Sequence, residues 1–112
     1  MKTWKTRSGH DIIQLLSGRS NVFLLTNGKN NILIDTGPKI MWKILDSRLR
    51  KSGINHIDYL ILTHTHFDHA ANAYQINEKY NALVIVHQFE ASYLISGDNI
   101  IPKGTNYFTR GL

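Results

Sequence analysis

The first third of the chain alternates short apolar runs with short polar turns. The runs DIIQLL (residues 11–16), VFLLT (22–26) and NILID (31–35) are rich in aliphatic and β-branched residues, which is typical of strands. SGRSN separates the first two runs and TNGKN the last two, and Asn27-Gly28 is a strong signal for a β-hairpin. The pattern predicts an antiparallel meander of three strands.

A helical pattern replaces this alternation after residue 35. Pro38 suits the first position of a helix, and IMWKILDSRLR follows it. Four apolar residues of that stretch fall on one helical stripe: Ile40, Ile44, Leu45 and Leu49. Gly53 is a typical stop signal. We therefore expect a helix that begins near Pro38 and ends before Gly53.

The rest of the chain predicts strands and helices in turn. DYLILT (58–63) and ALVIV (82–86) are apolar at consecutive positions, as in strands covered on both faces. AANAYQINEKY (70–80) and QFEASYLIS (88–96) are helix-like, and the sequence from Gly97 onward predicts irregular structure. The order predicts the α/β (α+β) class, with helices packed on a mixed, mostly antiparallel sheet.

Composition limits the size and the chemistry of this fold. A chain of 112 residues with 42% hydrophobic content suits one modest domain spanning residues 1–112. The absence of cysteine excludes disulfides, thiolate metal sites and cysteine nucleophiles. The sequence contains no run with the length and apolarity of a signal peptide or a membrane span, so we expect a soluble, cytoplasmic protein without membrane contact.

The net charge of +5 raises the possibility of a nucleic-acid partner. Basic residues gather on the predicted first helix: Lys39, Lys43, Arg48, Arg50 and Lys51. No aromatic-interleaved basic motif accompanies them, and a solvated helix face explains such a group more simply. We therefore do not expect nucleic acid as a partner.

The stretch THTHFDHA (63–70) carries the strongest chemical signal. It places His64, His66, Asp68 and His69 directly after a predicted buried strand. Imidazole nitrogen and carboxylate oxygen are the ligands that zinc and similar divalent ions accept when no thiolate is available. In an extended loop, residues two apart point the same way, so His64 and His66 can bind one ion. Asp68 and His69 follow on a neighbouring side and can bind a second.

Simpler explanations exist for parts of this pattern. The histidines could be ordinary polar residues of a surface loop, although their density favours a metal site over this alternative. Asp35 begins Asp-Thr-Gly-Pro, which is good turn chemistry even without a metal. Asp58 could hydrogen-bond a metal-ligating imidazole. A helix-borne His-Glu-x-x-His site is absent, which excludes that protease class.

The strand LILTH with THTHFDHA, preceded by NILIDTG, resembles the metallo-β-lactamase superfamily from about Val22 to the end of the chain. The resemblance implies one half of an αββα sandwich. It also implies that His64 and His66 are ligands of a first metal, and that Asp68 and His69 are ligands of a second. Asp35 and Thr63 match positions that support the metal-binding loops without being metal ligands. Ala70, Ala71 and Asn72 stand where the family commonly has glycines.

The resemblance further implies a zinc-dependent hydrolase, with two zinc ions in a completed site and iron or manganese as alternative metals. Metal-activated hydroxide would attack an ester, lactam, thioester or phosphodiester, and Asp68 would orient it as the catalytic residue. Family members are about twice this length, and the further His and Asp ligands lie in their second half. The alternative is a truncated or split half-domain without activity of its own, completed by a complementary C-terminal half or a second copy.

Overall fold

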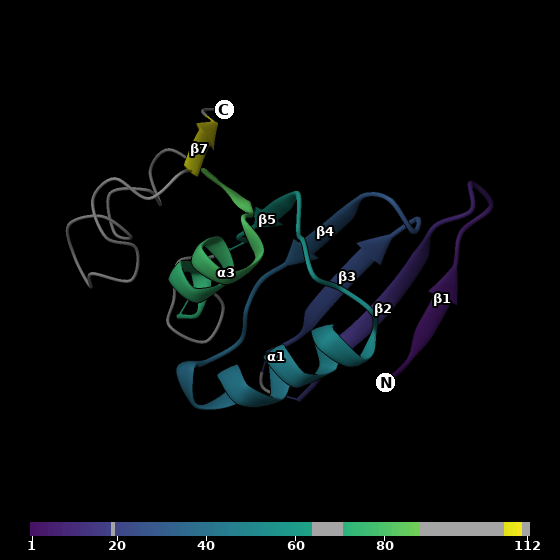
Figure 1. Ribbon diagram of the computed structural model, residues 1–112, viewed down its shortest axis with the longest axis horizontal. Helices are drawn as coiled ribbons and strands as arrows, with labels where there is room; N and C mark the ends of the chain where they lie inside the picture. Colours follow the sequence, from purple (N-terminus) through teal and green to yellow (C-terminus); the bar gives the residue numbers. More distant parts are fainter. Residues whose placement is uncertain (19, 64–70, 88–106, 111–112) are drawn as a thin grey trace.

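The strands of the protein join in one sheet in the order in which they occur along the chain (Figure 1). The computed structural model describes residues 1–18, 20–63, 71–87 and 107–110. The strands are β1 (Thr3–Lys5), β2 (Asp11–Leu16), β3 (Val22–Thr26), β4 (Asn31–Ile34), β5 (Tyr59–Ile61), β6 (Leu83–His87) and β7 (Tyr107–Arg110). The helices are the 3-10 turn η1 (Lys39–Met41), α1 (Trp42–Lys51) and α3 (Ala73–Tyr80). The predicted mixed α/β class is confirmed.

The sheet divides into an antiparallel and a parallel part. Strands β1 to β4 pair antiparallel with their neighbours, and β4 to β7 pair parallel with theirs. A parallel pair needs a long crossover connection, and α1 and α3 lie in the connections β4 to β5 and β5 to β6. The carboxyl ends of β4 and β5 therefore meet at the same edge of the sheet.

The predicted antiparallel meander is confirmed strand by strand. β2 and β3 have the bounds that their apolar runs predicted, and β4 ends one residue earlier than expected. In the hairpin between β3 and β4, Asn27 Oδ1 accepts hydrogen bonds from the backbone nitrogens of Lys29 (2.9 Å) and Asn30 (2.7 Å). Gly28 has a φ of +90°, a conformation that glycine adopts without steric cost.

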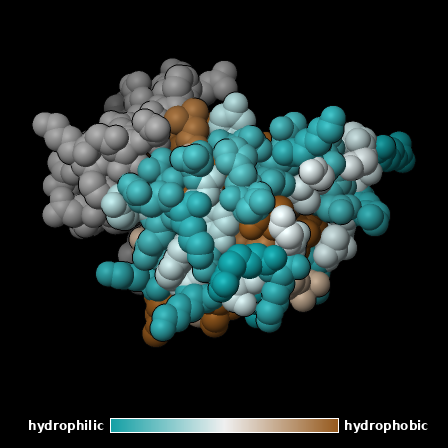
Figure 2. Space-filling view, in the orientation of Figure 1, coloured by the Kyte–Doolittle hydropathy of each residue, from teal (hydrophilic) through white to brown (hydrophobic). Residues whose placement is uncertain are grey.

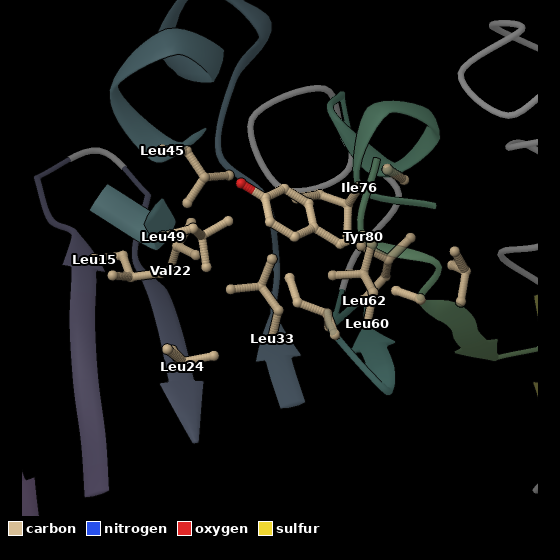
Figure 3. Packing of buried hydrophobic residues seen from close by; sticks show 14 of the residues in the cluster. Leu15, Val22, Leu24, Leu33, Leu45, Leu49, Leu60, Leu62, Ile76 and Tyr80 are labelled. Atoms are coloured by element: carbon tan, nitrogen blue, oxygen red, sulfur yellow. The ribbon is translucent and has the colours of Figure 1, made fainter. Parts of the chain in front are cut away.

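Both α-helices pack on the same face of the sheet and enclose the core (Figure 3). Leu45 and Leu49 of α1 and Ile76 and Tyr80 of α3 point toward the strands. The strands contribute fully buried side chains to the same cluster: Leu15, Val22, Leu24, Leu33, Leu60 and Val84. Burying each such aliphatic side chain stabilises the fold by about 1.5–3 kcal/mol before entropy is counted.

The opposite side of the sheet, here called the second face, is also apolar. Its side chains form two rows across β3 to β6, because directly paired residues share a face: Phe23, Ile34, Ile61 and Ile85 in one row, Leu25, Ile32, Tyr59 and Leu83 in the other. Within the described residues these side chains are only partly buried, and Tyr59 is 43% exposed. Among the described residues, β5 is therefore fully covered on the core face, where Leu60 is buried, and only partly covered on the second face, so cover on both faces stays a prediction.

The start of the first helix also differs from its prediction. Residues 39–41 form the 3-10 turn η1, and α1 begins only at Trp42. The tighter winding of η1 changes the phase of the side chains. Ile40 is 88% exposed and Ile44 is 40% exposed, whereas Leu45 and Leu49 are buried. The predicted stripe of four apolar residues thus holds for its second half only.

A cluster of polar side chains, here called the interhelix cluster (Asp46, Arg50, Lys79 and Tyr80), joins the two helices. Asp46 accepts hydrogen bonds from the Tyr80 hydroxyl and from Lys79 Nζ, both at 2.5 Å, and Arg50 Nε lies 3.4 Å from its carboxylate. Burial raises the pKa of Asp46, but these hydrogen bonds and the charges of Lys79 and Arg50 outweigh it, so the pKa is lowered. Burial and Asp46 together raise the pKa of Tyr80.

Two short strands were not predicted from the sequence. β1 has only three residues, Thr3–Lys5, and β7 lies in the stretch that was predicted to be irregular, which corrects that expectation. The predicted helix 88–96 lies outside the described residues. No helix in the part of the chain that the structure describes is long and apolar enough to cross a membrane. Figure 2 shows mainly hydrophilic residues on the side seen in Figure 1, with hydrophobic ones near the centre and along the lower edge.

Candidate metal centre

The turn that follows β4 begins with a residue in an uncommon backbone conformation. Asp35 has a φ of +64°, in the left-handed region that Asp and Asn tolerate better than most residues. Its backbone nitrogen donates a hydrogen bond to the carbonyl oxygen of Ile61, 2.9 Å away at the end of β5. The residue is only 4% exposed. The turn is therefore tied to the end of the neighbouring parallel strand from its first residue.

The Asp35 carboxylate continues this connection. Its Oδ1 accepts a hydrogen bond from the backbone nitrogen of Thr63 (2.8 Å), and its Oδ2 accepts one from the Thr63 hydroxyl (2.6 Å). Hydrogen bonds to an ionised carboxylate are stronger than neutral ones. Thr63 directly precedes His64 in the sequence. The structure thus brings together the two residues predicted to support the metal loops, and places them at the start of the histidine segment.

Thr36 and Asn72 make a second connection from the same turn. Both are fully buried. The backbone nitrogen of Asn72 donates to Thr36 Oγ1 (3.1 Å). The side-chain nitrogen of Asn72 lies 3.1 Å from the carbonyl oxygen of Thr36, 3.4 Å from that of Gly37 and 3.0 Å from that of Pro38. We call Asp35, Thr36, Thr63 and Asn72 the turn cluster.

Gly37 is required between these residues for two reasons. Its φ of +72° is one that side chains rarely adopt, and an added Cβ would lie 2.7 Å from Leu16 Cδ1 in the core. A larger residue would therefore force either the Leu16 side chain or the turn to move. The Asp-Thr-Gly-Pro sequence thus follows the end of β4 and also packs closely against the core through Gly37.

The four predicted ligands, His64, His66, Asp68 and His69, lie outside the described residues. In the ranges that the structure does describe, no three His, Asp or Glu side chains lie close enough to hold a metal ion. Thr63, directly before residues 64–70, and Asn72, two residues after them, both contact the Asp35–Pro38 turn. The donor set of three imidazoles and a carboxylate in a protein without cysteine fits a divalent ion.

Asp58 does not have the role that the sequence suggested. Its Oδ2 accepts a hydrogen bond from the backbone nitrogen of Asn31 (2.7 Å), and its Oδ1 lies 3.2 Å from His56 Nε2. Both contacts are at the amino end of β5, whereas Thr63 follows its carboxyl end. Asp58 therefore stabilises the start of the parallel pair and does not face the histidine segment. A hollow of about 340 Å³ beside it is lined in part by His10 and Tyr59.

Asn72 is the site residue that sequence reasoning missed. The sequence shows it at a position where small residues were expected and directly before a helix. An asparagine there predicts a helix cap, yet its side chain makes no cap hydrogen bond to α3. Its partners lie 34–36 residues earlier in the chain, so no local signal could have identified them.

Comparisons with known proteins agree with this arrangement. The family description of the metallo-beta-lactamase superfamily matches residues 17–104. A probable metallo-hydrolase of Methanocaldococcus jannaschii is 42% identical over 81 residues, which are 72% of this chain and 39% of that protein. An acyl-coenzyme A thioesterase of Bos taurus is 30% identical over 90 residues, covering 72% of this chain and 30% of the relative. The chain spans well under half the length of these relatives.

Solved structures share the fold. The metallo-beta-lactamase SMB-1 superposes with a TM-score of 0.73 at 20% identity, over 100% of this chain and 46% of that one. The FEZ-1 metallo-beta-lactamase of Legionella gormanii superposes with a TM-score of 0.68 at 19% identity, over 100% of this chain and 45% of that one. The described sheet and helices thus correspond to a little under half of such a structure. With the family match over most of its length, the chain belongs to the metallo-beta-lactamase superfamily.

Proposed function

We propose that this chain carries the metal-binding half of a metal-dependent hydrolase. The observation that supports the proposal best is that Thr63 and Asn72, which stand before and after residues 64–70 in the sequence, are both bonded to the same buried turn. Side chains held at the carboxyl ends of parallel strands are well placed to converge. The relative named as an acyl-coenzyme A thioesterase favours an acyl substrate, within the wider proposed class of esters, thioesters, lactams and phosphodiesters.

The proposed ligands are His64 and His66 for one ion and Asp68 and His69 for a second. Zinc suits this donor set, and iron or manganese would be accepted by the same atoms. A bound ion would polarise the substrate oxygen and lower the pKa of a water. Asp68 would also accept a hydrogen bond from the attacking water and so orient it. Asp35 would hold the strand end before His64 through Thr63.

The second face supports a requirement for a further sheet. Two ligands per ion are fewer than the three or four protein ligands of ordinary zinc sites. The two apolar rows of the second face are only partly buried by the described residues, and the matched structures are more than twice as long. We therefore propose that a second sheet covers this face and completes the site. It would come from a complementary half, with a second copy of this chain as the alternative, and without it the half-domain would be inactive.

Metal content tests the proposed ligands directly. The purified chain would be dialysed against a weak chelator and its zinc measured by elemental analysis. We expect about one or two ions per chain in the wild type, and a loss of metal in the His64→Ala/His66→Ala double variant. The His10→Ala/His56→Ala double variant is a matched control, because it removes two histidines away from the Thr63 end of β5. Equal zinc in all three proteins would contradict the proposed site.

Hydrolysis of a simple acyl thioester, followed by thiol release, tests the activity. Activity that survived in the His64→Ala/His66→Ala variant would belong to another site. Static light scattering separates the two sources of the second sheet. A dimer that a Tyr59→Lys substitution dissociates would support a second copy, since Tyr59 lies on the second face. A monomer would leave the complementary half as the occupant.

A further inference from the structure

The side-chain amide of Asn72 has an orientation that its surroundings determine. Three carbonyl oxygens, those of Thr36, Gly37 and Pro38, lie within 3.0–3.4 Å of its Nδ2. A flipped amide would place Oδ1 against three acceptors with no donor between them, so only the nitrogen can face the turn. The two hydrogens on Nδ2 are then shared among three carbonyl groups. The turn residues that Asn72 contacts directly follow Asp35, which holds Thr63.

The oxygen of the same amide, Oδ1, lowers the stability of the folded state. Asn72 is fully buried, and its Oδ1 has no hydrogen-bond partner among the described residues. A buried acceptor without a partner destabilises the folded state. An apolar side chain of similar size at this position would avoid that loss, but it would also remove the donor to the three turn carbonyls. The amide nitrogen thus serves the turn, while the amide oxygen has no partner among the described residues.

The hydrogen bonds of Thr63 and of Asn72 join residues before and after the proposed ligands to the same turn. Thr63 is bonded to Asp35 and Asn72 to Thr36–Pro38, so two described residues that flank the segment with the proposed ligands are joined to four consecutive residues. Fixing both ends of a segment lowers the conformational entropy that it loses when its side chains gather around an ion. Asp35 alone would fix one end only.

From this geometry we infer that Asn72 is a positioning residue of the metal centre, which fixes the end of the histidine segment against the Asp35–Pro38 turn. The inference rests on the proposed function, because it assigns a purpose to the segment between Thr63 and Asn72. Asn72 acts through the backbone and touches neither substrate nor metal. Its effect is therefore expected in metal affinity and in the protection of backbone amides, in addition to the loss of stability that follows when a buried, hydrogen-bonded side chain is removed.

The test compares Asn72→Ala with Asn77→Ala in the 112-residue chain. Asn77 is a matched control because it lies on α3, the helix that directly follows Asn72, and its Nδ2 also donates to a backbone carbonyl, that of Ala82 at 2.8 Å. Zinc affinity is measured by competition with a chromophoric chelator, and hydrogen exchange of the backbone amides is measured in metal-free protein. Thr36→Val is a second variant that removes the hydroxyl contacting Asn72 while keeping the shape of the side chain.

We expect Asn72→Ala to weaken zinc binding by about tenfold or more, the size of effect seen when groups that orient metal ligands are removed. We also expect about tenfold faster exchange of the Asn72 amide, and a smaller change of the same sign in Thr36→Val. Asn77→Ala should leave both quantities close to wild type. Loss of zinc affinity in proportion to lost stability in both asparagine variants would overturn the inference.

The two readouts separate failure of this inference from failure of the proposed function. If the wild-type chain binds no zinc, the proposed ligand set fails, and the hydrogen exchange of metal-free protein still decides whether Asn72 fixes the segment. If zinc binds but Asn72→Ala keeps wild-type affinity and exchange, the proposed function stands and the positioning role of Asn72 is wrong.

Discussion

The interhelix cluster and the turn cluster both join segments that are far apart in the sequence, but they do so with different groups. In the interhelix cluster, two cations reach Asp46 from side chains that remain 46% and 63% exposed. In the turn cluster, Asp35 accepts from the Thr63 hydroxyl and backbone nitrogen, while the backbone and side-chain nitrogens of the buried Asn72 donate to the Thr36 hydroxyl and to the turn carbonyls. Long charged side chains tolerate small shifts, whereas backbone donors have fixed directions. We therefore expect the first cluster to act mainly on stability and the second mainly on the positions of Thr63 and Asn72.

The largest effect is expected for Asp46→Ala, which would break the interhelix cluster. It leaves the Tyr80 hydroxyl buried without its acceptor, and the free energy of unfolding should fall by about 2–3 kcal/mol. Urea denaturation measures this change. Zinc affinity, measured where both proteins are folded, should stay within about twofold of wild type. A parallel loss of zinc affinity would show that the two clusters are not separable.

Asp35→Asn is expected to lower zinc affinity strongly and stability only slightly. Asn tolerates the left-handed conformation, so the turn keeps its shape, but the charge and one acceptor facing Thr63 are lost. Zinc affinity should fall by about 10–100-fold, while the free energy of unfolding falls by only about 1 kcal/mol. Asp58→Asn is the matched control at the opposite end of β5 and should not change zinc affinity. Equal losses in both variants would argue against a positioning role for Asp35.

A smaller effect is expected for Tyr80→Phe. This variant removes one hydrogen bond to Asp46 and leaves the aromatic ring packed in the core. The free energy of unfolding should fall by about 1 kcal/mol in urea denaturation. Because Lys79 and Arg50 still contact Asp46, the loss should be well below that of Asp46→Ala. Equal losses would mean that the hydroxyl carries the whole stabilisation by the cluster.

The smallest effect concerns pH. The pKa of Asp46 is lowered from 3.8 in the folded protein, so its charged form stabilises the fold at pH values above that. This stabilisation is lost as the pH falls through the lowered pKa. The difference in unfolding free energy between wild type and Asp46→Asn should be constant near neutrality and should narrow below about pH 4. A difference that does not change with acid would show that Asp46 acts only through neutral hydrogen bonds.

The sequence predicted the fold best where the period of the apolar residues was regular. β2 and β3 were located to the residue because their apolar runs are bounded by turn-forming residues. Ile40 was misplaced because a 3-10 turn precedes α1 and changes the phase of the helix. β1 and β7 have only three and four residues, too few for an alternating pattern to be recognised, and their pairing depends on the neighbouring strand.

The candidate site was predicted in its chemistry and only partly in its architecture. The resemblance assigned Asp35 and Thr63 separately to the support of the metal loops, and it did not predict their direct contact. The contact of Asn72 with Thr36–Pro38 depends on a crossover that brings residues 36 and 72 together, which no local pattern encodes. The role suggested for Asp58 failed for a similar reason, because the direction of β5 places it at the other end of the strand.

The strand order of the sheet bears on how the protein is made. Among the described strands, each one after β1 pairs with the strand that precedes it along the chain, so the sheet can extend one neighbour at a time as the chain leaves the ribosome. Pro38, the last residue of the Asp35–Pro38 turn, precedes Thr63 by 25 residues and Asn72 by 34. The residues of the turn are therefore synthesised first, and Thr63 and Asn72 can form their hydrogen bonds to it as they emerge.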